Sequence, residues 1–263
     1  MRRRKWILPL VIMTGITLIG CESNDVDENQ KSNQTIMLAE EASLDEGYKQ
    51  YKPIAIEFMT EDITEEGIYE WNVTTPKFTG FDNITALIGQ IITDTGKEYE
   101  FIKTLKDGEE RFNTYCFIVE PSIITNTSAL LSLSLNMYDY TGGAHGNYWS
   151  YYFNYDLSTG EEITLDRIFK DDIDYLEVLY QYLFERVKDN EVFRNNLDIY
   201  YYKDKEPLQF YIEDGEIYIF FDVYGIGSYA DGQQVFDIPI EVVNNYLSDY
   251  GKIIYNKDLY SKK

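Results

Sequence analysis

Histidine and cysteine are almost absent from this chain of 263 residues, which holds one His and two Cys. These counts exclude zinc sites of the His-x-x-x-His and Cys-x-x-Cys kinds. The sequence also lacks a phosphate-cradling glycine loop, a calcium loop and a Gly-x-Ser-x-Gly elbow. We therefore expect no metal, no cofactor and no catalytic residue, and the sequence argues against an enzyme.

Long apolar runs are also missing, since the apolar stretch Trp6–Ile19 is shorter than the roughly 20 residues that span a bilayer. The basic segment Met1–Lys5 precedes it, which is the layout of a secretory signal. The stretch ends in Leu18–Cys21, which resembles a bacterial lipobox. We predict a lipoprotein signal peptide over residues 1–20 and lipidation of Cys21, which would hold the body outside the cytoplasm on a bacterial membrane. The alternative is a plain leader in which Cys21 is incidental.

The residues after Cys21 contain few large apolar side chains and many acidic and amide ones. Such a segment buries too little apolar surface to offset the entropy of ordering, so residues 21–50 are predicted to form an acidic tether. Once Cys21 is lipidated only Cys116 remains, and no disulfide forms within one chain. Cys116 lies in a strand pattern, where a buried thiol is expected; a catalytic pair with His145 is the alternative.

Basic residues are scarce beside acidic ones, 23 against 46. Removal of the leader, which holds four basic and no acidic residues, leaves a formal charge of −27. A field of this sign repels nucleic acid and favours cationic partners. The alternative is that the acidity only keeps a secreted protein soluble.

Hairpins rather than strand–helix alternation organise the rest of the chain, so we predict an α+β fold with a mainly antiparallel sheet and packed helices. The Asp214–Gly215 dipeptide is typical of a tight hairpin turn. Predicted strands cover Ile54–Phe58, Ile68–Pro76, Asn113–Thr125, Ser128–Tyr140, Asn147–Leu157, Leu208–Glu213, Glu216–Val223 and Val235–Ile240. Predicted helices begin at Asp82 as an N-cap, cover Ile173–Lys188, and cover Glu241–Tyr250 with Gly251 as a C-terminal cap.

The single histidine, His145, lies in the glycine-rich segment Thr141–Asn147 between two predicted strands. Gly142 and Gly143 indicate a backbone that turns through positive φ or is approached closely. One interpretation makes His145 an acid, a base or a metal ligand at the edge of a cleft. The other, which we favour, is that it hydrogen-bonds a turn.

A second candidate surface is the segment Asp222–Gly232, which mixes Tyr224 and Tyr229 with glycine on a predicted loop. Tyrosine provides contact area at little entropic cost, so loops of this composition often bind ligands. The alternative is a loop tied to its own sheet by tyrosine hydroxyls. The ligand-binding candidates are therefore Gly142, Gly143, His145, Tyr224 and Tyr229.

Several spaced motifs resemble the extracellular domain of the lysozyme-sensing anti-sigma-V factor family. They are Tyr140–Gly146, Phe153–Gly160, Ile163–Asp166, Ile168–Phe169, Phe210–Gly215, Ile219–Tyr224, Tyr229–Gly232 and Ile238–Ile240. The family domain also occurs as the non-catalytic N-terminal part of certain peptidoglycan deacetylases and in lipoproteins of unassigned function. The resemblance covers nearly all of the chain from about Pro53 to the end.

The resemblance implies two intimately associated subdomains, a smaller one over residues 51–126 and a larger one over residues 127–263. It also implies adhesion to an envelope ligand, either a cationic protein such as lysozyme or a peptidoglycan fragment, without catalysis. Neither a sigma-binding segment nor a deacetylase domain is expected. The alternatives are an envelope hydrolase that uses His145 with carboxylates, and an accessory subunit of an envelope complex.

Overall fold

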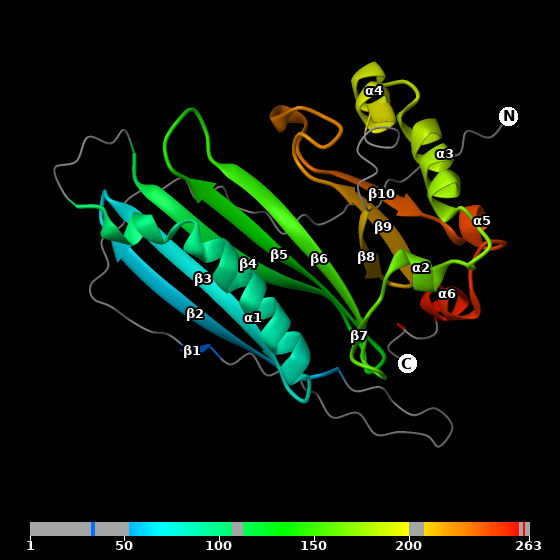
Figure 1. Cartoon of the computed structure of the whole chain (residues 1–263), viewed down its shortest axis with the longest axis horizontal. Helices are drawn as coiled ribbons and strands as arrows, with labels where there is room; N and C mark the ends of the chain where they lie inside the picture. The colour runs from blue at the N-terminus through cyan, green and yellow to red at the C-terminus, as the bar shows by residue number, and fades with distance from the viewer. Residues whose placement is uncertain (1–32, 35–52, 107–112, 200–207, 258–259, 261–263) are drawn as a thin grey trace, which may run out of the picture.

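The computed structural model describes residues 33–34, 53–106, 113–199, 208–257 and 260 (Figure 1). Cys21, the predicted signal peptide and most of the predicted tether lie outside these residues. The strands are β1 Asn33–Gln34, β2 Ile56–Glu65, β3 Tyr69–Phe78, β4 Tyr115–Asn126, β5 Leu130–Tyr140, β6 Asn147–Asp156, β7 Glu161–Glu162, β8 Gln209–Glu213, β9 Glu216–Phe221 and β10 Gln234–Ile238. The helices are α1 Asp82–Lys97, α2 Leu165–Ile168, α3 Tyr175–Val187, α4 Glu191–Ile199, α5 Ile240–Val243 and α6 Asp249–Ile254, with 3₁₀ turns η1 Glu100–Thr104 and η3 Tyr229–Asp231.

These elements form two sheets, and the predicted α+β class is confirmed. Strands β1 to β7 lie in sequence order in a large sheet, and β10, β9 and β8 form a small one. Neighbouring strands are antiparallel except for β3 and β4, which are parallel. The exception arises because α1 lies between them in the chain, and a parallel pair requires such a crossover.

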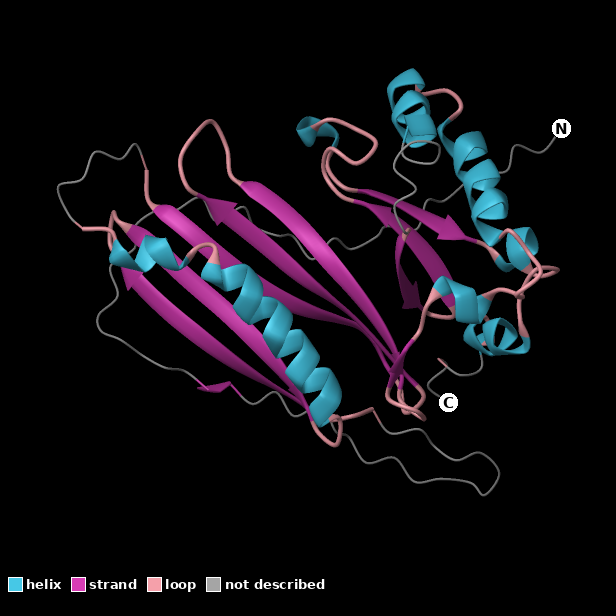
Figure 2. Cartoon of the chain, viewed as in Figure 1, coloured by secondary structure: helices cyan, strands magenta, loops and turns pink. Residues whose placement is uncertain are grey.

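Helix α1 covers one face of the large sheet, as Figure 2 shows. Its buried side chains Ile84, Ile88 and Ile92 recur every four residues and so share one stripe of the helix. They pack against inward side chains of the strands, among them Trp71 and Phe117. The other strand face carries the alternate residues and is largely polar. The large sheet therefore has one apolar face packed against α1 and one face that can make polar contacts.

The small sheet is built on the predicted hairpin. Asp214 and Gly215 both have positive φ, 48° and 75°, and join β8 to β9. Two positive φ values give the turn the twist that matches antiparallel strands. This prediction is confirmed.

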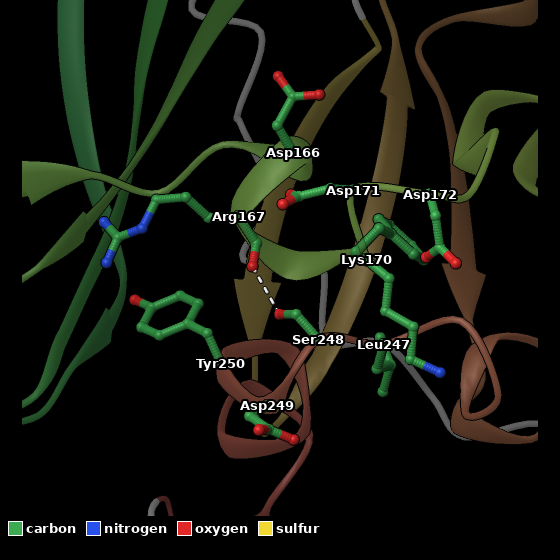
Figure 3. Close-up of a pocket in the computed structure, with 10 residues that line it drawn as sticks. Asp166, Arg167, Lys170, Asp171, Asp172, Leu247, Ser248, Asp249 and Tyr250 are labelled. Carbon is green, nitrogen blue, oxygen red and sulfur yellow. Dashed lines mark hydrogen bonds between the residues drawn. The ribbon is translucent and has the colours of Figure 1, made fainter.

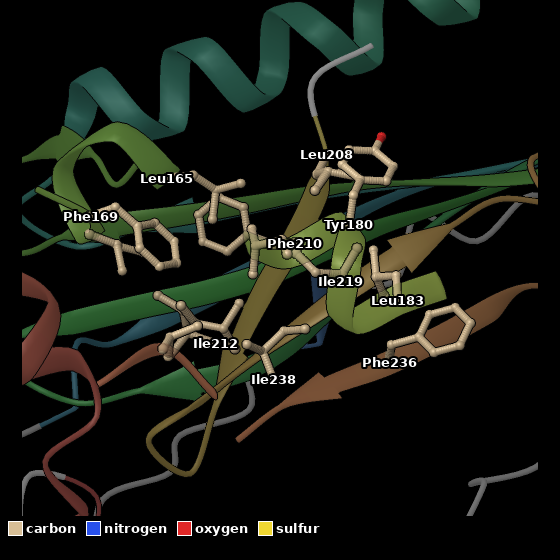
Figure 4. Close-up of a cluster of buried hydrophobic side chains, with 14 of the residues drawn as sticks. Leu165, Phe169, Tyr180, Leu183, Leu208, Phe210, Ile212, Ile219, Phe236 and Ile238 are labelled. Carbon is tan, nitrogen blue, oxygen red and sulfur yellow. The ribbon is translucent and has the colours of Figure 1, made fainter. Parts of the chain in front are cut away.

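Helices α2 to α6 surround the small sheet and form a second core with it (Figure 4). Tyr180 and Leu183 of α3 lie over Ile219 of β9, and all three are nearly inaccessible to solvent. Helix α3 begins at Asp174, whose side chain accepts a hydrogen bond from the Glu177 N–H at 3.1 Å. Such an N-cap satisfies a backbone donor that the helix leaves unpaired.

The predicted subdomain boundary between residues 126 and 127 falls within the large sheet, because β4 and β5 pair on either side of it. Apart from Leu130 of β5, which belongs to the second core, the residues of the two apolar cores separate along the chain between Leu157 and Ile163. Hydrogen bonds join the sheets, since Thr125 Oγ1 donates to the Ile212 carbonyl at 2.7 Å and Asn154 Nδ2 to the Phe210 carbonyl at 2.9 Å.

Three local predictions differ from the structure. Asp82 is the first residue of α1 and not its N-cap, a position that Phe81 occupies. The single predicted helix over Glu241–Tyr250 is replaced by α5 and α6, and Gly251 lies inside α6 rather than capping a helix. Ser248 instead starts α6 by accepting the Gly251 N–H at 3.0 Å. Helix α4 was not predicted.

Asp156, at the end of β6, links the two cores electrostatically. It accepts a hydrogen bond from the Ser158 N–H at 2.9 Å and forms an ion pair with Arg167 of α2 at 3.0 Å. Burial acts to raise the pKa of Asp156, but the hydrogen bonds from Ser158 and Arg167 outweigh it and hold that pKa below its ordinary value. The ionised form is therefore the form that stabilises the fold.

We expect Asp156→Asn to lower the free energy of unfolding at pH 7 by about 1–2 kcal/mol, as loss of a charge-assisted bond to a partly exposed partner does. A lowered pKa in the folded state gives stability that is present above the unfolded pKa of about 3.9 and is lost as pH falls through the folded value. The variant should thus differ from wild type at pH 7 and approach it in acid. Urea unfolding at both pH values measures this.

The control is Asp94→Asn, which breaks an exposed pair with Lys97 on α1. Exposed pairs contribute little, so we expect a change of about 0.5 kcal/mol or less. Equal effects of the two substitutions would contradict the role given to Asp156.

Candidate functional site

The two candidate segments of the sequence meet in the structure. The turn between β5 and β6 carries His145, and the loop between β9 and β10 carries Tyr229. The His145 ring stacks on the Tyr229 ring with centroids 4.0 Å apart and an interplanar angle of 22°. Aromatic contact therefore joins the β5–β6 turn of the large sheet to the β9–β10 loop of the small sheet.

Two more tyrosines complete an aromatic cluster, which we define as His145, Tyr148, Tyr224 and Tyr229. Tyr229 is central, with ring centroids 5.4 Å from Tyr148 and 5.9 Å from Tyr224. Tyr224 is 58% exposed, His145 is exposed, and the other two rings are half-buried. The cluster thus presents ring faces and hydroxyls to solvent while its inner edges are packed.

Gly142 and Gly143 determine the backbone conformation of the β5–β6 turn and provide no side chain for binding. Gly142 and Gly143 have φ of 106° and 110°, a region that other residues rarely adopt. Tyr140 Oη donates to the Gly143 carbonyl at 2.9 Å. His145 Nδ1 donates to the carbonyl of Gly146 at 2.8 Å, which orients the ring over Tyr229. His145 therefore hydrogen-bonds its own turn and lies on an exposed surface, and a role as acid, base or metal ligand stays a prediction.

The β9–β10 loop is held by its own hydrogen bonds. Ser228 and Asp231 form a reciprocal pair around η3, in which the Ser228 N–H donates to Asp231 Oδ2 at 2.8 Å and the Asp231 N–H to the Ser228 carbonyl at 3.1 Å. Asn196 of α4 donates to the Ile226 carbonyl at 3.1 Å. Tyr224 sits at a positive φ of 64°. These restraints present Tyr224 and Tyr229 in a fixed conformation, which reduces the entropy lost on binding.

The hydroxyls of Tyr148 and Tyr229 remain protonated near neutral pH. Burial raises the pKa of Tyr148, with further contributions from Tyr229 and Asp222, and burial also raises the pKa of Tyr229. Each hydroxyl can therefore donate as well as accept a hydrogen bond. Aromatic faces beside neutral hydroxyls suit a ligand that has apolar C–H faces and many polar groups, such as a sugar ring.

A separate depression of about 820 Å³ lies between α2 and α6 (Figure 3). Its cations are engaged in the fold, because Arg167 lies over the Tyr250 ring at 4.4 Å and Lys170 Nζ donates to the Asn245 carbonyl at 2.6 Å. Ser248 Oγ donates to the Arg167 carbonyl at 2.7 Å across its floor. No motif of the sequence indicated this depression, and we treat it as structural.

Within the part of the chain that the structure describes, no group of three or more His, Cys, Asp or Glu is placed to hold a metal ion. Cys116 is 1% exposed in β4, as expected for a buried strand thiol. None of the described helices is long and apolar enough to cross a membrane. Tyr148 and Asp222 belong to the site and were missed as site residues from the sequence, because strand and loop positions give no sign of which partners they meet.

Two family models match the chain. The model described as "Deacetylase PdaC" matches residues 23–148, and that of the protein of unknown function DUF3298 matches residues 166–241. The peptidoglycan-N-acetylmuramic acid deacetylase PdaC of Bacillus subtilis (strain 168) is 27% identical over 157 residues, which cover 57% of this chain and 33% of the relative. The chain thus spans about one third of the length of this relative.

Two solved structures share the fold. A DUF3298 family protein from Pseudomonas aeruginosa PAO1 has a TM-score of 0.58 at 16% identity, covering 75% of this chain and 96% of its own. A member of the same family from Bacteroides fragilis NCTC 9343 has a TM-score of 0.55 at 22% identity, covering 80% of this chain and 100% of its own. At such identities the likeness concerns the fold alone.

These comparisons correct one prediction and confirm part of another. The prediction that the chain is not an enzyme is wrong, because the matching family model and the relative are both named for deacetylases. The resemblance to deacetylase relatives is confirmed, whereas the comparisons do not show a link to the anti-sigma-V factor. His145 and Tyr148 fall at the end of the first matched region, and Tyr224 and Tyr229 fall in the second. One region of the chain thus matches the PdaC model and another matches the DUF3298 model, and the aromatic cluster contains residues of both matched regions.

Proposed function

We propose that this chain is a cell-envelope protein that binds the glycan strands of peptidoglycan at the aromatic cluster. The stacking of His145 on Tyr229 carries the proposal, because it joins residues of both matched regions into one exposed surface. The similarity to a peptidoglycan deacetylase supports the choice of ligand. Attachment to a membrane through a lipid on Cys21 is part of the proposal and would hold the site outside the cytoplasm.

The chemistry of the cluster fits an amino-sugar polymer. Tyr224 and Tyr229 offer ring faces to the C–H side of a pyranose, and the hydroxyls of Tyr148 and Tyr229 offer donors and acceptors to its substituents. The rings are ordered before binding by the turn and loop contacts described above.

Tyr229→Ala should weaken binding to purified peptidoglycan by roughly 30-fold, because truncation of a central aromatic anchor costs about 2 kcal/mol. Co-sedimentation of the full chain with insoluble peptidoglycan over a range of wall concentrations measures the affinity. The matched control is Tyr151→Ala, which removes a 38% exposed tyrosine of β6 on the face of the sheet opposite to Tyr148.

Wild-type binding that Tyr229→Ala leaves unchanged would show that the site is misplaced. No co-sedimentation of the wild type would refute glycan binding. If the wild type does not bind peptidoglycan but binds lysozyme with an affinity that falls as salt rises, the ligand is instead the cationic partner that the net charge of −23 favours.

A second candidate function is deacetylation of the bound glycan, which the match to the PdaC model and relative favours. Release of acetate from purified peptidoglycan by the full chain measures it. Acetate release that saturates with the same dependence on wall concentration as co-sedimentation would support this candidate, and its absence would leave binding as the activity.

A further inference from the structure

The β9–β10 loop begins with a half-buried carboxylate, Asp222, directly after the last residue of β9. Its Oδ2 accepts the Ser150 N–H of β6 at 3.1 Å. Its Oδ1 accepts the side-chain amide of Gln233 at 3.0 Å and the Val223 N–H at 3.0 Å. One carboxylate therefore binds the first residues of the loop, the last residue before β10, and the backbone of the large sheet.

The network extends across three strands of the large sheet. Gln233 Nε2 also lies 3.2 Å from Ser150 Oγ, and Ser150 Oγ donates to Asn136 Oδ1 of β5 at 3.0 Å. Asn136 Nδ2 in turn donates to Ser122 Oγ of β4 at 3.0 Å. Both ends of the loop are thus fastened to one continuous polar row on the face of the sheet that α1 does not cover.

Asp222 is held by N–H donors, and among the described residues it forms no salt bridge. A carboxylate that accepts several N–H bonds makes shorter and stronger bonds than a neutral acceptor does. The position is also close to the aromatic cluster, since Tyr148 lies two residues before Ser150 on the same face of β6. A substitution at Asp222 therefore changes the distance between the β9–β10 loop and β6.

We propose that Asp222 is a positioning residue of the glycan site, whose carboxylate clamps both ends of the β9–β10 loop to β6 and so sets Tyr229 against His145. This inference rests on the proposed function. The hydrogen bonds of Asp222 go to Ser150, Val223 and Gln233 and not to the four residues of the aromatic cluster, so its effect passes through the loop that it fastens.

The clamp makes binding sensitive to pH. Burial raises the pKa of Asp222, against the opposing effect of the hydrogen bonds from Gln233, Ser150 and Val223. The carboxylate consequently takes up its proton at a higher pH than an exposed aspartate, and the neutral acid is a weaker acceptor for the three N–H groups. Binding should weaken as pH falls through this raised pKa.

Other titratable groups near the clamp do not mimic this effect. Tyr148 and Tyr152 of β6 face Asp222 and are neutral below pH 7, since burial raises the pKa of both. Asp231 and His145 lie farther along the loop and in the facing turn, and any contribution from them persists when Asp222 is replaced. A comparison with Asp222→Asn therefore isolates the carboxylate.

The test uses the full chain with Asp222→Asn, Gln233→Ala and the control Asp237→Asn, which changes an exposed carboxylate of β10 paired with Arg186. Chymotrypsin cleavage after Tyr224 and Tyr229, followed by mass spectrometry without ligand, reports how firmly the loop is held. Co-sedimentation with purified peptidoglycan between pH 4 and pH 8 reports binding.

We expect Asp222→Asn to speed cleavage in the loop, to weaken binding at pH 7 by about tenfold, and to flatten the pH profile, with a smaller effect of Gln233→Ala. Asp237→Asn should match the wild type in all three. Unchanged cleavage and binding in both clamp variants would overturn the proposal, as would faster cleavage with unchanged binding.

Failure of the Asp222 clamp and failure of the proposed glycan binding can be distinguished. If Asp222→Asn loosens the loop but the wild type does not bind peptidoglycan, the clamp stands and the proposed ligand is wrong. If Asp222→Asn does not fold, Gln233→Ala still removes one bond of the clamp, and unchanged loop cleavage and unchanged binding at pH 7 in that variant would overturn the role of the network.

Discussion

Gly146→Ala should lower the free energy of unfolding by about 2–3 kcal/mol and abolish binding, because overpacking a rigid site costs this much and displaces its backbone. A Cβ at this position would lie 2.4 Å from the Asp139 carbonyl oxygen and 2.4 Å from Tyr138 Oη. The first of these atoms is backbone and cannot turn aside. The β5–β6 turn must therefore shift, and His145 moves with it away from Tyr229. Urea unfolding and co-sedimentation with peptidoglycan measure the two effects.

The matched control is Gly143→Ala in the same turn. Its Cβ would meet no atom within 4 Å, although its φ of 110° disfavours alanine. Backbone strain of this kind costs about 1–2 kcal/mol, and it does not press on Tyr138. If the Gly143 and Gly146 variants lose stability and binding to the same extent, close packing under His145 is not what fixes the turn.

Gly251→Ala should lower the free energy of unfolding by about 3 kcal/mol or more. This is opposite to the usual effect, because alanine in place of a glycine inside a helix normally stabilises a protein. A Cβ on Gly251 would lie 2.1 Å from the Ile168 carbonyl oxygen, at the contact between α6 and α2. That carbonyl also accepts the Ser248 N–H at 2.9 Å, so its position is fixed. The gain of about 1 kcal/mol in helix propensity is too small to offset the clash.

Gly89→Ala is the control for this prediction. Gly89 lies inside α1 and a Cβ there would meet nothing within 4 Å, so alanine should stabilise by about 0.5–1 kcal/mol. The two substitutions are expected to move the urea midpoint in opposite directions. A stabilised Gly251→Ala variant would contradict the packing of α6 against α2.

Local signals in the sequence were sufficient for most strands and for α3. Asp214–Gly215 predicted its hairpin because two positive φ values are a property of those two residues alone. Gly251 was wrongly predicted to be a cap because a glycine near a helix end usually marks one. Here it permits the close approach of α2, which is distant along the chain. The parallel pairing of β3 with β4 likewise joins segments that are far apart in the chain, and local sequence patterns do not indicate such a pairing.

The candidate site shows the same division. His145, Tyr224 and Tyr229 were singled out in two separate segments by glycine and tyrosine content, but nothing in either segment indicated that they would stack. Asp222 was included only as the first residue of a loop. Its role depends on Ser150 and Gln233, and a sequence does not reveal such hydrogen-bond partners.

The proposed glycan site is one surface formed by the two matched regions. Amide exchange of the full chain with and without soluble peptidoglycan fragments, released by a muramidase, tests it directly. The prediction is protection confined to the β5–β6 turn and the β9–β10 loop, and lost in the Tyr229→Ala variant. Protection elsewhere, for example along α2 and α6, or none at saturating fragment, would contradict it.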